Sequence, residues 1–257
     1  MASKWTLITG ASEGLGVDFA RLAAAEGRDL ILVARQAQKL ERLADELRAK
    51  HRIAVEVIPA DLSDPQTVET LWRKVALRRH IEILVNNAGL GYNGPFLDGD
   101  GAREMQSVMV NVVAATILMK RAVAHMAQQG GGRVLNLAST AAFMPGPNMA
   151  VYHATKAYLL SLSEAVAEEL RGGDVTITAL CPGATRTNFA TDAGMEHIRL
   201  FSTLPVPTAA RVAKSGWKAM KRGKRVHVTG LPNKLFAFAP RLVPRAFVTR
   251  IAALFLK

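Results

Sequence analysis

A tyrosine and a lysine four residues apart, Tyr152 and Lys156, are the side chains in this sequence whose spacing best suits chemistry. Residues at this spacing share one face of a helix, with Cβ atoms about 5–6 Å apart. A phenol has an ordinary pKa of about 10, so it exchanges protons poorly at neutral pH. We expect the Lys156 ammonium to stabilise the phenolate and to lower the pKa of Tyr152. The pair would then suit proton transfer to or from a carbonyl or alcohol oxygen.

The pair alone does not define a site, because a surface lysine beside a half-buried tyrosine has the same spacing. Two further features accompany it: Ser139, thirteen residues before Tyr152, and a glycine turn at residues 10–16. The turn reads Gly10-Ala11-Ser12-Glu13-Gly14-Leu15-Gly16, after an apolar run and before a helical pattern. Glycines at such a turn let the backbone approach a pyrophosphate, whose charge the helix N-terminus meets. The GxxxGxG spacing predicts a dinucleotide site, although three glycines in a turn can also serve packing alone.

The end of the second predicted strand bears on which dinucleotide binds. Arg35 stands where an NAD-selective site usually has a carboxylate for the ribose 2′-hydroxyl. Its guanidinium can bind a 2′-phosphate through two hydrogen bonds, whereas the alternative is a solvated arginine at a strand end. Glu13 argues mildly against a phosphate, because it adds negative charge nearby. We predict NADP(H) as the cofactor.

The chain has 257 residues and 49% hydrophobic content, enough for one large core. Apolar runs rich in β-branched residues predict seven strands at 5–9, 29–34, 54–59, 83–86, 133–138, 175–180 and 225–229. Helical patterns lie between them at 15–26, 38–50, 65–77, 102–128, 150–171 and 208–222. This alternation predicts an α/β fold in a single domain, with a doubly wound parallel sheet (a Rossmann fold) and helices on both faces.

Charge is unevenly distributed along the sequence. The net charge is +12, and residues 197–257 contain 13 Lys and Arg and no Asp or Glu. Such a segment favours anionic partners: phosphorylated substrates, acidic lipids, acidic proteins or nucleic acid. We expect no nucleic-acid partner, because the cations alternate with apolar residues of the buried type rather than with exposed stacking aromatics.

Several classes of protein are disfavoured. The single cysteine, Cys181, excludes an internal disulfide, fits a reducing compartment and stands among apolar neighbours as a buried thiol. We find no signal peptide, no uninterrupted apolar run of about 18–20 residues and no metal-ligand spacing among the six His. We therefore expect no metal and a cytoplasmic location, including the inner face of a membrane as a peripheral site.

Taken together in their order, these residues resemble the short-chain dehydrogenase/reductase family. The resemblance runs from Lys4 to about Gly230 and is carried by Thr9 to Gly16, Asp61-Leu62, Asn86-Asn87-Ala88-Gly89, Asn111, Ser139, Tyr152, Lys156 and Pro182-Gly183. Each motif alone is weak to moderate, and the ordered set is highly specific. No member of the catalytic set is missing, which argues against a non-catalytic relative.

The resemblance implies a role for each catalytic residue. Tyr152 would be the general acid in reduction, and Ser139 would hold the same substrate oxygen by a hydrogen bond. Lys156 would lower the pKa of Tyr152 and bind the nicotinamide ribose. Asn111 would hold a water molecule linked to Lys156 in a proton relay, with a purely structural asparagine as the alternative.

The resemblance also implies a set of cofactor contacts. They are Gly10, Ser12, Glu13, Gly14, Leu15, Gly16, Arg35, Asp61, Leu62, Asn87, Ala88, Gly89, Tyr152, Lys156, Pro182, Gly183 and Thr187. Asp61 and Leu62 would border the adenine, and Thr187 would bond the nicotinamide carboxamide. We interpret Asn86 as structural and His153 as pocket lining or surface.

A long segment without predicted structure, residues 183–207, follows a strand and suits a substrate lid. It contains the apolar residues Phe189, Met195, Ile198, Leu200 and Phe201. Together with the cationic segment, this composition favours an apolar substrate or one with an acyl chain on a phosphorylated carrier.

The C-terminal residues 231–257 form a basic, apolar extension beyond the predicted catalytic domain, residues 1–230. On a helical wheel from Pro244, one stripe collects Phe247, Val248, Ile251, Leu254 and Phe255. The stripe has three interpretations: packing on the domain or a second subunit, peripheral contact of residues 232–257 with a membrane, or a lid over a lipophilic site.

The sequence therefore predicts an NADP(H)-dependent oxidoreductase that transfers a hydride between nicotinamide and a carbonyl or secondary alcohol. A homodimer or homotetramer is expected from the resemblance only. The alternative function is a dinucleotide-binding redox sensor or a membrane-associated partner-binding protein without turnover. An intact set of Ser139, Tyr152 and Lys156 disfavours that alternative.

Overall fold

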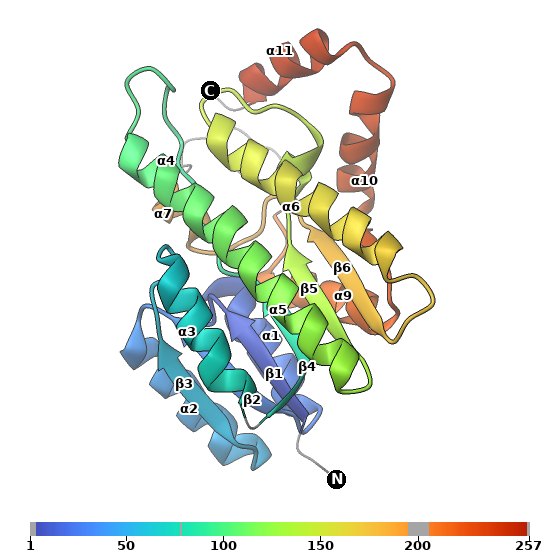
Figure 1. Cartoon of the computed structure of the whole chain (residues 1–257). Helices are drawn as coiled ribbons and strands as arrows, with labels where there is room; N and C mark the ends of the chain where they lie inside the picture. Colours follow the sequence, from blue (N-terminus) through green and yellow to red (C-terminus); the bar gives the residue numbers. More distant parts are fainter. Residues whose placement is uncertain (1–3, 78, 195–205, 256–257) are drawn as a thin grey trace.

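The computed structural model describes residues 4–77, 79–194 and 206–255. Its centre is one seven-stranded parallel sheet with the strand order β3-β2-β1-β4-β5-β6-β7 (Figure 1). The strands are β1 Lys4–Thr9, β2 Asp29–Ala34, β3 Val55–Pro59, β4 His80–Asn86, β5 Gly132–Leu137, β6 Val175–Cys181 and β7 Val226–Val228. All seven predicted strands are present, with ends that differ by at most a few residues. The α/β fold with a doubly wound sheet is confirmed.

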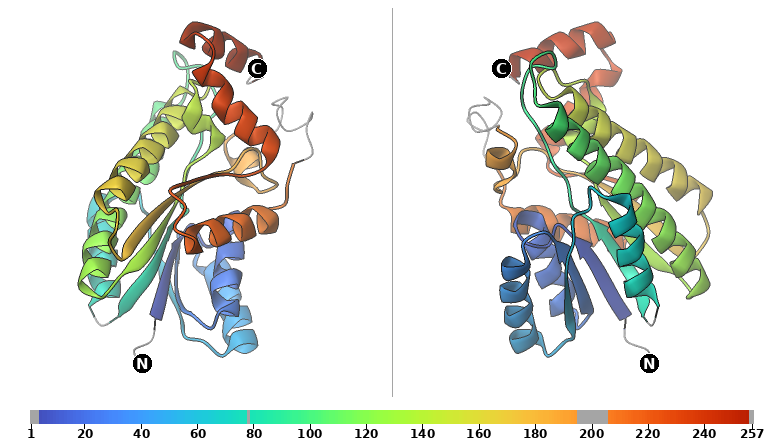
Figure 2. Two further views of the ribbon diagram at one scale, coloured as in Figure 1. Left: turned by 90° about the vertical axis from the view of Figure 1, so that its right-hand side faces the viewer. Right: turned by 60° about the vertical axis from the view of Figure 1, so that its left-hand side comes forward.

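Helices cover both faces of the sheet (Figure 2). The helices and helical turns are α1 Gly14–Ala25, α2 Ala37–His51, α3 Pro65–Ala76, α4 Gly101–Val108, η1 Met109–Ala114, α5 Ala115–Gln128, η2 Thr140–Phe143, α6 Ala150–Glu169, α7 Phe189–Asp192, α9 Ala209–Lys221, α10 Leu231–Phe238, η3 Ala239–Arg241 and α11 Arg245–Phe255. One core cluster joins α1, α2 and α9 to the sheet, and a second joins α3, α5 and α6 to its other face. Two-sided burial explains why the strands are continuous apolar runs.

The helix predicted at 102–128 is not one continuous α-helix. It consists of α4, the π-helical segment η1 and α5. The run Gly101–Gln128 is long and apolar enough to cross a membrane by length and composition. However, Leu118, Met119 and Ala122 are fully or almost fully buried in the second core cluster. We therefore interpret the run as a core helix of the domain.

The strand order changes direction between β1 and β4, because β1 pairs with β2 on one side and with β4 on the other. In an open parallel sheet such a switch point leaves a crevice at the carboxyl ends of the strands. The glycine turn follows β1 and Asn87 follows β4, so both lie at that crevice.

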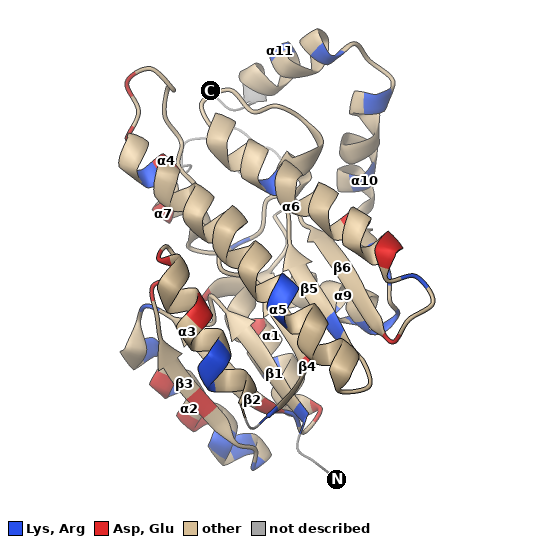
Figure 3. Ribbon diagram, in the orientation of Figure 1, with Lys and Arg blue, Asp and Glu red and all other residues tan. Residues whose placement is uncertain are grey.

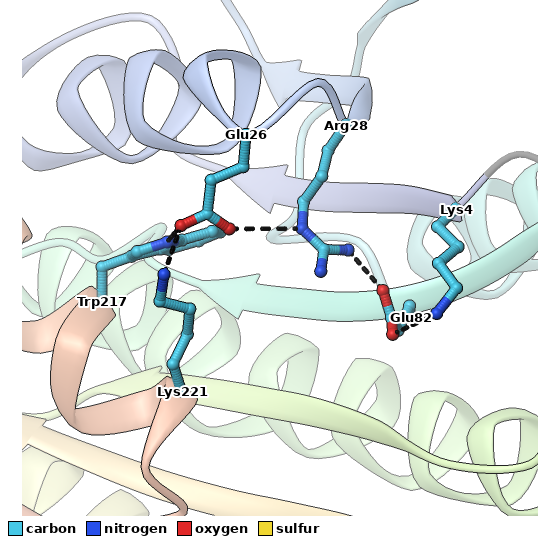
Figure 4. A network of polar contacts seen from close by, with 6 residues as sticks. All are labelled: Lys4, Glu26, Arg28, Glu82, Trp217 and Lys221. Carbon is cyan, nitrogen blue, oxygen red and sulfur yellow. Dashed lines mark hydrogen bonds and ion pairs between the residues drawn. The ribbon is translucent and has the colours of Figure 1, made fainter.

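The amino ends of the strands are joined by a chain of charged contacts (Figure 4). Arg28 binds Glu82 and lies 3.6 Å from a Glu26 oxygen through its Nε, and Lys4 Nζ lies 2.9 Å from Glu82. Glu26 also accepts a 2.9 Å hydrogen bond from Trp217 Nε1. The network connects β1, β4, the end of α1 and α9 at the amino ends of the strands, opposite the crevice.

The C-terminal extension forms more regular structure than the single helix expected from Pro244. It contains α10, η3 and α11, and α10 begins directly after Gly230, whose φ of +79° suits glycine.

The segment 183–207, which the sequence predicted to be without regular structure, contains the short helix α7. Met195, Ile198, Leu200 and Phe201 lie outside the described residues. Cys181 is a buried free thiol, as predicted.

Candidate active site

The glycine turn closes tightly at the end of β1. Gly10 and Gly14 have positive φ values of +63° and +55°, which non-glycine residues rarely adopt. A Cβ on Gly16 would lie 2.1 Å from the Gly10 carbonyl oxygen. The glycines are thus required by backbone conformation at the first two positions and by close packing at the third.

Asn87 holds the glycine turn from the neighbouring strand end. Its Nδ2 donates to the carbonyl oxygens of Thr9 and Gly10, both at 3.0 Å. The Thr9 hydroxyl in turn accepts from the backbone N–H groups of Asn87 and Ala88, both at 3.0 Å. These bonds connect the carboxyl ends of β1 and β4, where the cleft begins.

The N-terminus of α1 faces this cleft without a side-chain cap. Its N-cap residue, Glu13, makes no capping hydrogen bond, whereas Asp64 and Asp100 cap α3 and α4 through their carboxylates. Ser12, Glu13, Gly14 and Leu15 line the cleft, as expected. Free backbone N–H groups at a helix N-terminus form an anion site, so this end suits a pyrophosphate.

Arg35, Asp61 and Leu62 line the same end of the cleft, again as expected. The pKa of Asp61 is lowered, first by hydrogen bonds from Ser63 and to a smaller degree by the Arg35 charge. Lys39 on α2 also lines this end, and its Nζ lies 3.3 Å from Glu13 Oε2. Sequence reasoning missed Lys39, because no local pattern shows which lysine of the predicted helix 38–50 reaches Glu13.

The opposite wall of the cleft brings together Ser139, Tyr152 and Lys156. Ser139 follows β5, and its Oγ accepts a 3.1 Å hydrogen bond from the N–H of Ala141. Tyr152 and Lys156 lie on α6, with the Lys156 Nζ 5.7 Å from the centre of the tyrosine ring. The three residues that the sequence singled out therefore converge at one point.

The sequence predicted a lowered pKa for Tyr152, whereas in the protein alone that pKa is raised. Burial raises the pKa of Tyr152 to about 12, and a hydrogen bond with Ser139 offsets only part of that rise. Lys156 Nζ instead donates a 2.8 Å hydrogen bond to the Leu137 carbonyl. Removal of the phenol from water disfavours the phenolate, so the pKa of Tyr152 rises.

Lys156 is itself strongly affected by its position. It is almost fully buried, and burial lowers its pKa to about 8. A buried ammonium is stabilised only by the groups that face it, here the Leu137 carbonyl. The pKa of Lys156 therefore lies close enough to neutral pH for the side chain to exchange a proton there.

Asn111 lies in the π-helical segment η1, and its side chain is fully engaged. Its Oδ1 accepts from the Leu90 N–H at 2.8 Å, and its Nδ2 donates to the Leu90 carbonyl at 2.8 Å and to Thr155 Oγ1 at 3.0 Å. A π-bulge often marks a functional site, because it re-aims one side chain. The amide joins the backbone after β4 to α6, and its role in a proton relay stays a prediction.

The remaining predicted residues also have clear positions. Asn86 donates to Ala115 O at 3.1 Å and to Asn136 Oδ1 at 3.0 Å, so its structural interpretation is confirmed. His153 lines the cleft, and its Nδ1 lies 2.8 Å from the Met144 carbonyl oxygen. Ala88, Gly89, Pro182, Gly183 and Thr187 line the cleft as well.

The apolar end of the cleft includes Phe189, which the sequence placed in the expected substrate lid, and residues of the C-terminal extension. Phe189 stacks on Tyr152 with ring centres 5.5 Å apart. The C-terminal extension lines the same cleft through Phe236, Ala239, Pro240, Val243, Val248, Ile251 and Ala252. Of the three interpretations of the extension, its inner face thus fits the lid. The distance of these residues from Tyr152 in the sequence left no local signal of the contact.

The cleft has a volume of about 800 Å³, which suits a large ligand. Among the described residues, no group of three or more His, Cys, Asp or Glu side chains could hold a metal ion. Residues 4–197 match the family model for short chain dehydrogenases. The chain belongs to the short chain dehydrogenase family.

Individual relatives of this short chain dehydrogenase agree in fold and class. The ketoacyl reductase HetN of Nostoc is 32% identical over 86% of this chain and 76% of its own length. A short-chain dehydrogenase from Sphingobium yanoikuyae, solved with NADPH, is 31% identical, with a TM-score of 0.83 over 93% of this chain and 90% of its own. One from Burkholderia phymatum, solved with NAD, is 25% identical, with a TM-score of 0.82 over 94% of each chain. Both dinucleotides thus occur among the relatives.

Proposed function

We propose that this short chain dehydrogenase is an NADP(H)-dependent reductase of carbonyl groups on apolar or acyl-type substrates. The observation that carries the proposal is the convergence of Ser139, Tyr152 and Lys156 on one wall of a cleft whose other end is the glycine turn. The first group supplies acid–base chemistry and the second supplies an anion site. Their connection by one cleft supports a dinucleotide and a substrate held side by side.

The residues present fit a nicotinamide dinucleotide. The uncapped N-terminus of α1 and the Gly10–Asn87 contact provide an anion site where backbone can approach a pyrophosphate. Gly89 leaves space at the other end, since a Cβ there would lie 3.2 Å from Lys156 Nζ. When bound, the cofactor supplies the hydride, which no side chain of the protein can provide.

The phosphorylated form of the cofactor is supported by two cations. Arg35 and Lys39 both line the cleft beyond the end of β2. Glu13 opposed this assignment at the sequence level because of its negative charge. Its ion pair with Lys39, at 3.3 Å, compensates that charge locally. The pair leaves the Arg35 guanidinium to bind a 2′-phosphate.

Ser139 and Tyr152 would act on the substrate oxygen. The Ser139 hydroxyl is fixed by the Ala141 N–H and can donate its own proton to a carbonyl oxygen. Tyr152, neutral in the buried site, can then deliver its proton as the oxygen gains negative charge. Lys156, whose pKa is close to 8, can return a proton to that phenolate. A neutral tyrosine at physiological pH favours the direction of reduction.

The substrate class follows from the lining of the cleft near Tyr152. Met144, Met149 and Phe189 line it from the catalytic domain, and Phe236, Val243, Val248 and Ile251 line it from the C-terminal extension. This surface favours an alkyl or ring system over a sugar or a small acid. The name of the relative HetN, a ketoacyl reductase, is consistent with an acyl substrate.

A screen of NADPH oxidation with bulky ketones, 3-oxoacyl thioesters and steroids, with NADH as the control cofactor, tests the proposal. We expect turnover with at least one apolar class and a preference for NADPH. Tyr152→Phe should abolish turnover and preserve NADPH affinity measured by calorimetry. Absence of affinity for either nucleotide would refute the proposal, and an unaltered cellular output with Tyr152→Phe would instead indicate the redox sensor.

A further inference from the structure

The two C-terminal helices, α10 and α11, expose large apolar side chains that are not part of the cleft lining. Phe247 is 55% exposed and Leu254 is 64% exposed, and both belong to the apolar stripe predicted on the helical wheel from Pro244. Exposed apolar residues also occur along the rest of the extension, at Leu231, Leu235, Phe238 and Leu242. Soluble proteins rarely present so many in one segment unless the surface binds something.

A second segment, distant in sequence, adds to this surface. The loop between β4 and α4 exposes Phe96 and Leu97, with exposed fractions of 73% and 90%. This loop and α11 lie at the same end of the molecule in every view (Figures 1 and 2). Apolar residues from two parts of the chain therefore gather around the end where the cleft is lined by the extension.

The charge on the extension indicates the kind of partner. Its described cations are Lys234, Arg241, Arg245 and Arg250, and none of the four forms an ion pair within the described residues. No Asp or Glu occurs from residue 197 to the end of the chain, and α10 and α11 carry blue segments without red ones in Figure 3. The β4–α4 loop does carry Asp98 and Asp100, so the electrostatic attraction comes from the C-terminal helices.

We propose that α10, α11 and the tip of the β4–α4 loop dock the protein on an anionic lipid surface. Exposed Phe and Leu side chains beside unpaired Arg and Lys are the composition of helices that lie in a membrane interface. The inner face of the same helices lines the cleft at Val248 and Ala252, so docking would place the apolar end of the cleft against the lipid.

A second copy of this chain fits the surface less well than a lipid does. A two-fold contact pairs the same patch on both subunits, which would bring the cations of one extension against the cations of the other. No acidic residue of the extension is available to compensate them. A bilayer that contains acidic lipids supplies both the apolar phase and the negative charge.

The test is co-sedimentation of the full-length protein with vesicles of phosphatidylcholine alone or with about 30% phosphatidylglycerol. We expect at least tenfold tighter binding to the anionic vesicles. Phe247→Ser with Leu254→Ser should weaken that binding by about tenfold or more, because it removes exposed apolar contacts. Arg241→Glu with Arg245→Glu should weaken it by at least about 25-fold, because each lost cation contributes a factor of about five and each new carboxylate adds repulsion.

Two variants near the amino ends of the strands, away from the C-terminal extension, serve as matched controls. Leu77→Ser removes an apolar residue that is 79% exposed just before β4, and Lys50→Glu reverses a charge on the last turn of α2. Neither should alter vesicle binding. All the substituted side chains are exposed, so circular dichroism should show unchanged folding. The proposal is wrong if the C-terminal and control variants bind vesicles equally, or if light scattering shows that the C-terminal variants only separate subunits. The readout does not depend on turnover, so it is distinguishable from the proposed reductase activity.

Discussion

The ammonium of Lys156 donates a 2.8 Å hydrogen bond to the carbonyl of Leu137, the last residue of β5. This contact attaches the catalytic helix α6 to the end of the sheet through a charged group that is almost fully buried. Burial of the ammonium costs folding free energy, and the bond to Leu137 offsets part of that cost.

Lys156→Met should stabilise the protein at pH 7 and abolish turnover. The fall in the pKa of Lys156 from 10.5 to about 8 corresponds to about 3 kcal/mol of unfavourable charge burial. Loss of the bond to Leu137 offsets about 1 kcal/mol of the gain. We expect the free energy of unfolding, measured with urea at pH 7, to rise by about 1–2 kcal/mol.

The advantage of this variant should disappear as the pH rises. Between about pH 8 and pH 10.5 the folded wild type has released the Lys156 proton while the unfolded chain still holds it. The unfolded state then binds more protons, so the stability of the wild type rises with pH across this window. Lys120→Met, at an exposed position of α5, is the control and should show no such convergence. If the difference in unfolding free energy between Lys156→Met and the wild type stayed constant from pH 7 to pH 10, the lowered pKa of Lys156 would be contradicted.

Arg35→Ala and Lys39→Ala should each reduce kcat/KM for NADPH by about 10–100-fold and leave that for NADH nearly unchanged. Arg35→Ala removes about 1.5–3 kcal/mol of charge-assisted bonding to a 2′-phosphate, and Lys39→Ala removes the cation that compensates Glu13 beside that phosphate. Lys39→Ala also leaves the Glu13 carboxylate without its partner at 3.3 Å. Adding Glu13→Ala to that variant should therefore recover part of the loss. Arg42→Ala, on the exposed side of α2, serves as the control, and equal losses for both nucleotides would refute 2′-phosphate binding.

Gly16→Ala should destabilise the fold and abolish cofactor binding. The new Cβ would lie 2.1 Å from the carbonyl oxygen of Gly10, so the turn and α1 would have to separate. Overpacking of this kind costs about 1–3 kcal/mol or more. Thermal unfolding measures it, with Gly101→Ala as the control, because a Cβ at that position meets no atom within 4 Å. A Gly16→Ala protein with the thermal midpoint of the control would show that the turn can relax.

Ser139→Ala should lower kcat by about 10²–10³-fold with little change in the affinity for NADPH. The loss corresponds to removal of one preorganised hydrogen-bond donor to the substrate oxygen. The substitution also removes the acceptor of the Ala141 N–H, so a small fall in stability of about 1 kcal/mol should accompany it. Stopped-flow measurement of single turnovers separates the two effects. An increase in KM alone would place Ser139 in binding rather than in the chemical step.

Much of the catalytic wall could be predicted because it depends on local order. Tyr152 and Lys156 share a helix face by their spacing, and Ser139 follows a strand that neighbours the strand leading to Pro182. Lys39 was missed since nothing in the sequence shows which exposed lysine reaches Glu13 across two helices. The pKa of Tyr152 was predicted in the wrong direction because its burial is a property of the packed site.

The sequence by itself determined the alternation of strands and helices, the glycine turn after β1 and the order of Ser139, Tyr152 and Lys156. These features follow from backbone conformation and from side-chain periods of two and 3.6 residues, which are local. Only the tertiary structure decided that the C-terminal extension lines the cleft with Val248 and Ala252 while Phe247 and Leu254 remain exposed. An amphipathic stripe shows that a face seeks an apolar partner, and only the packed chain shows which part of that face finds one within the molecule.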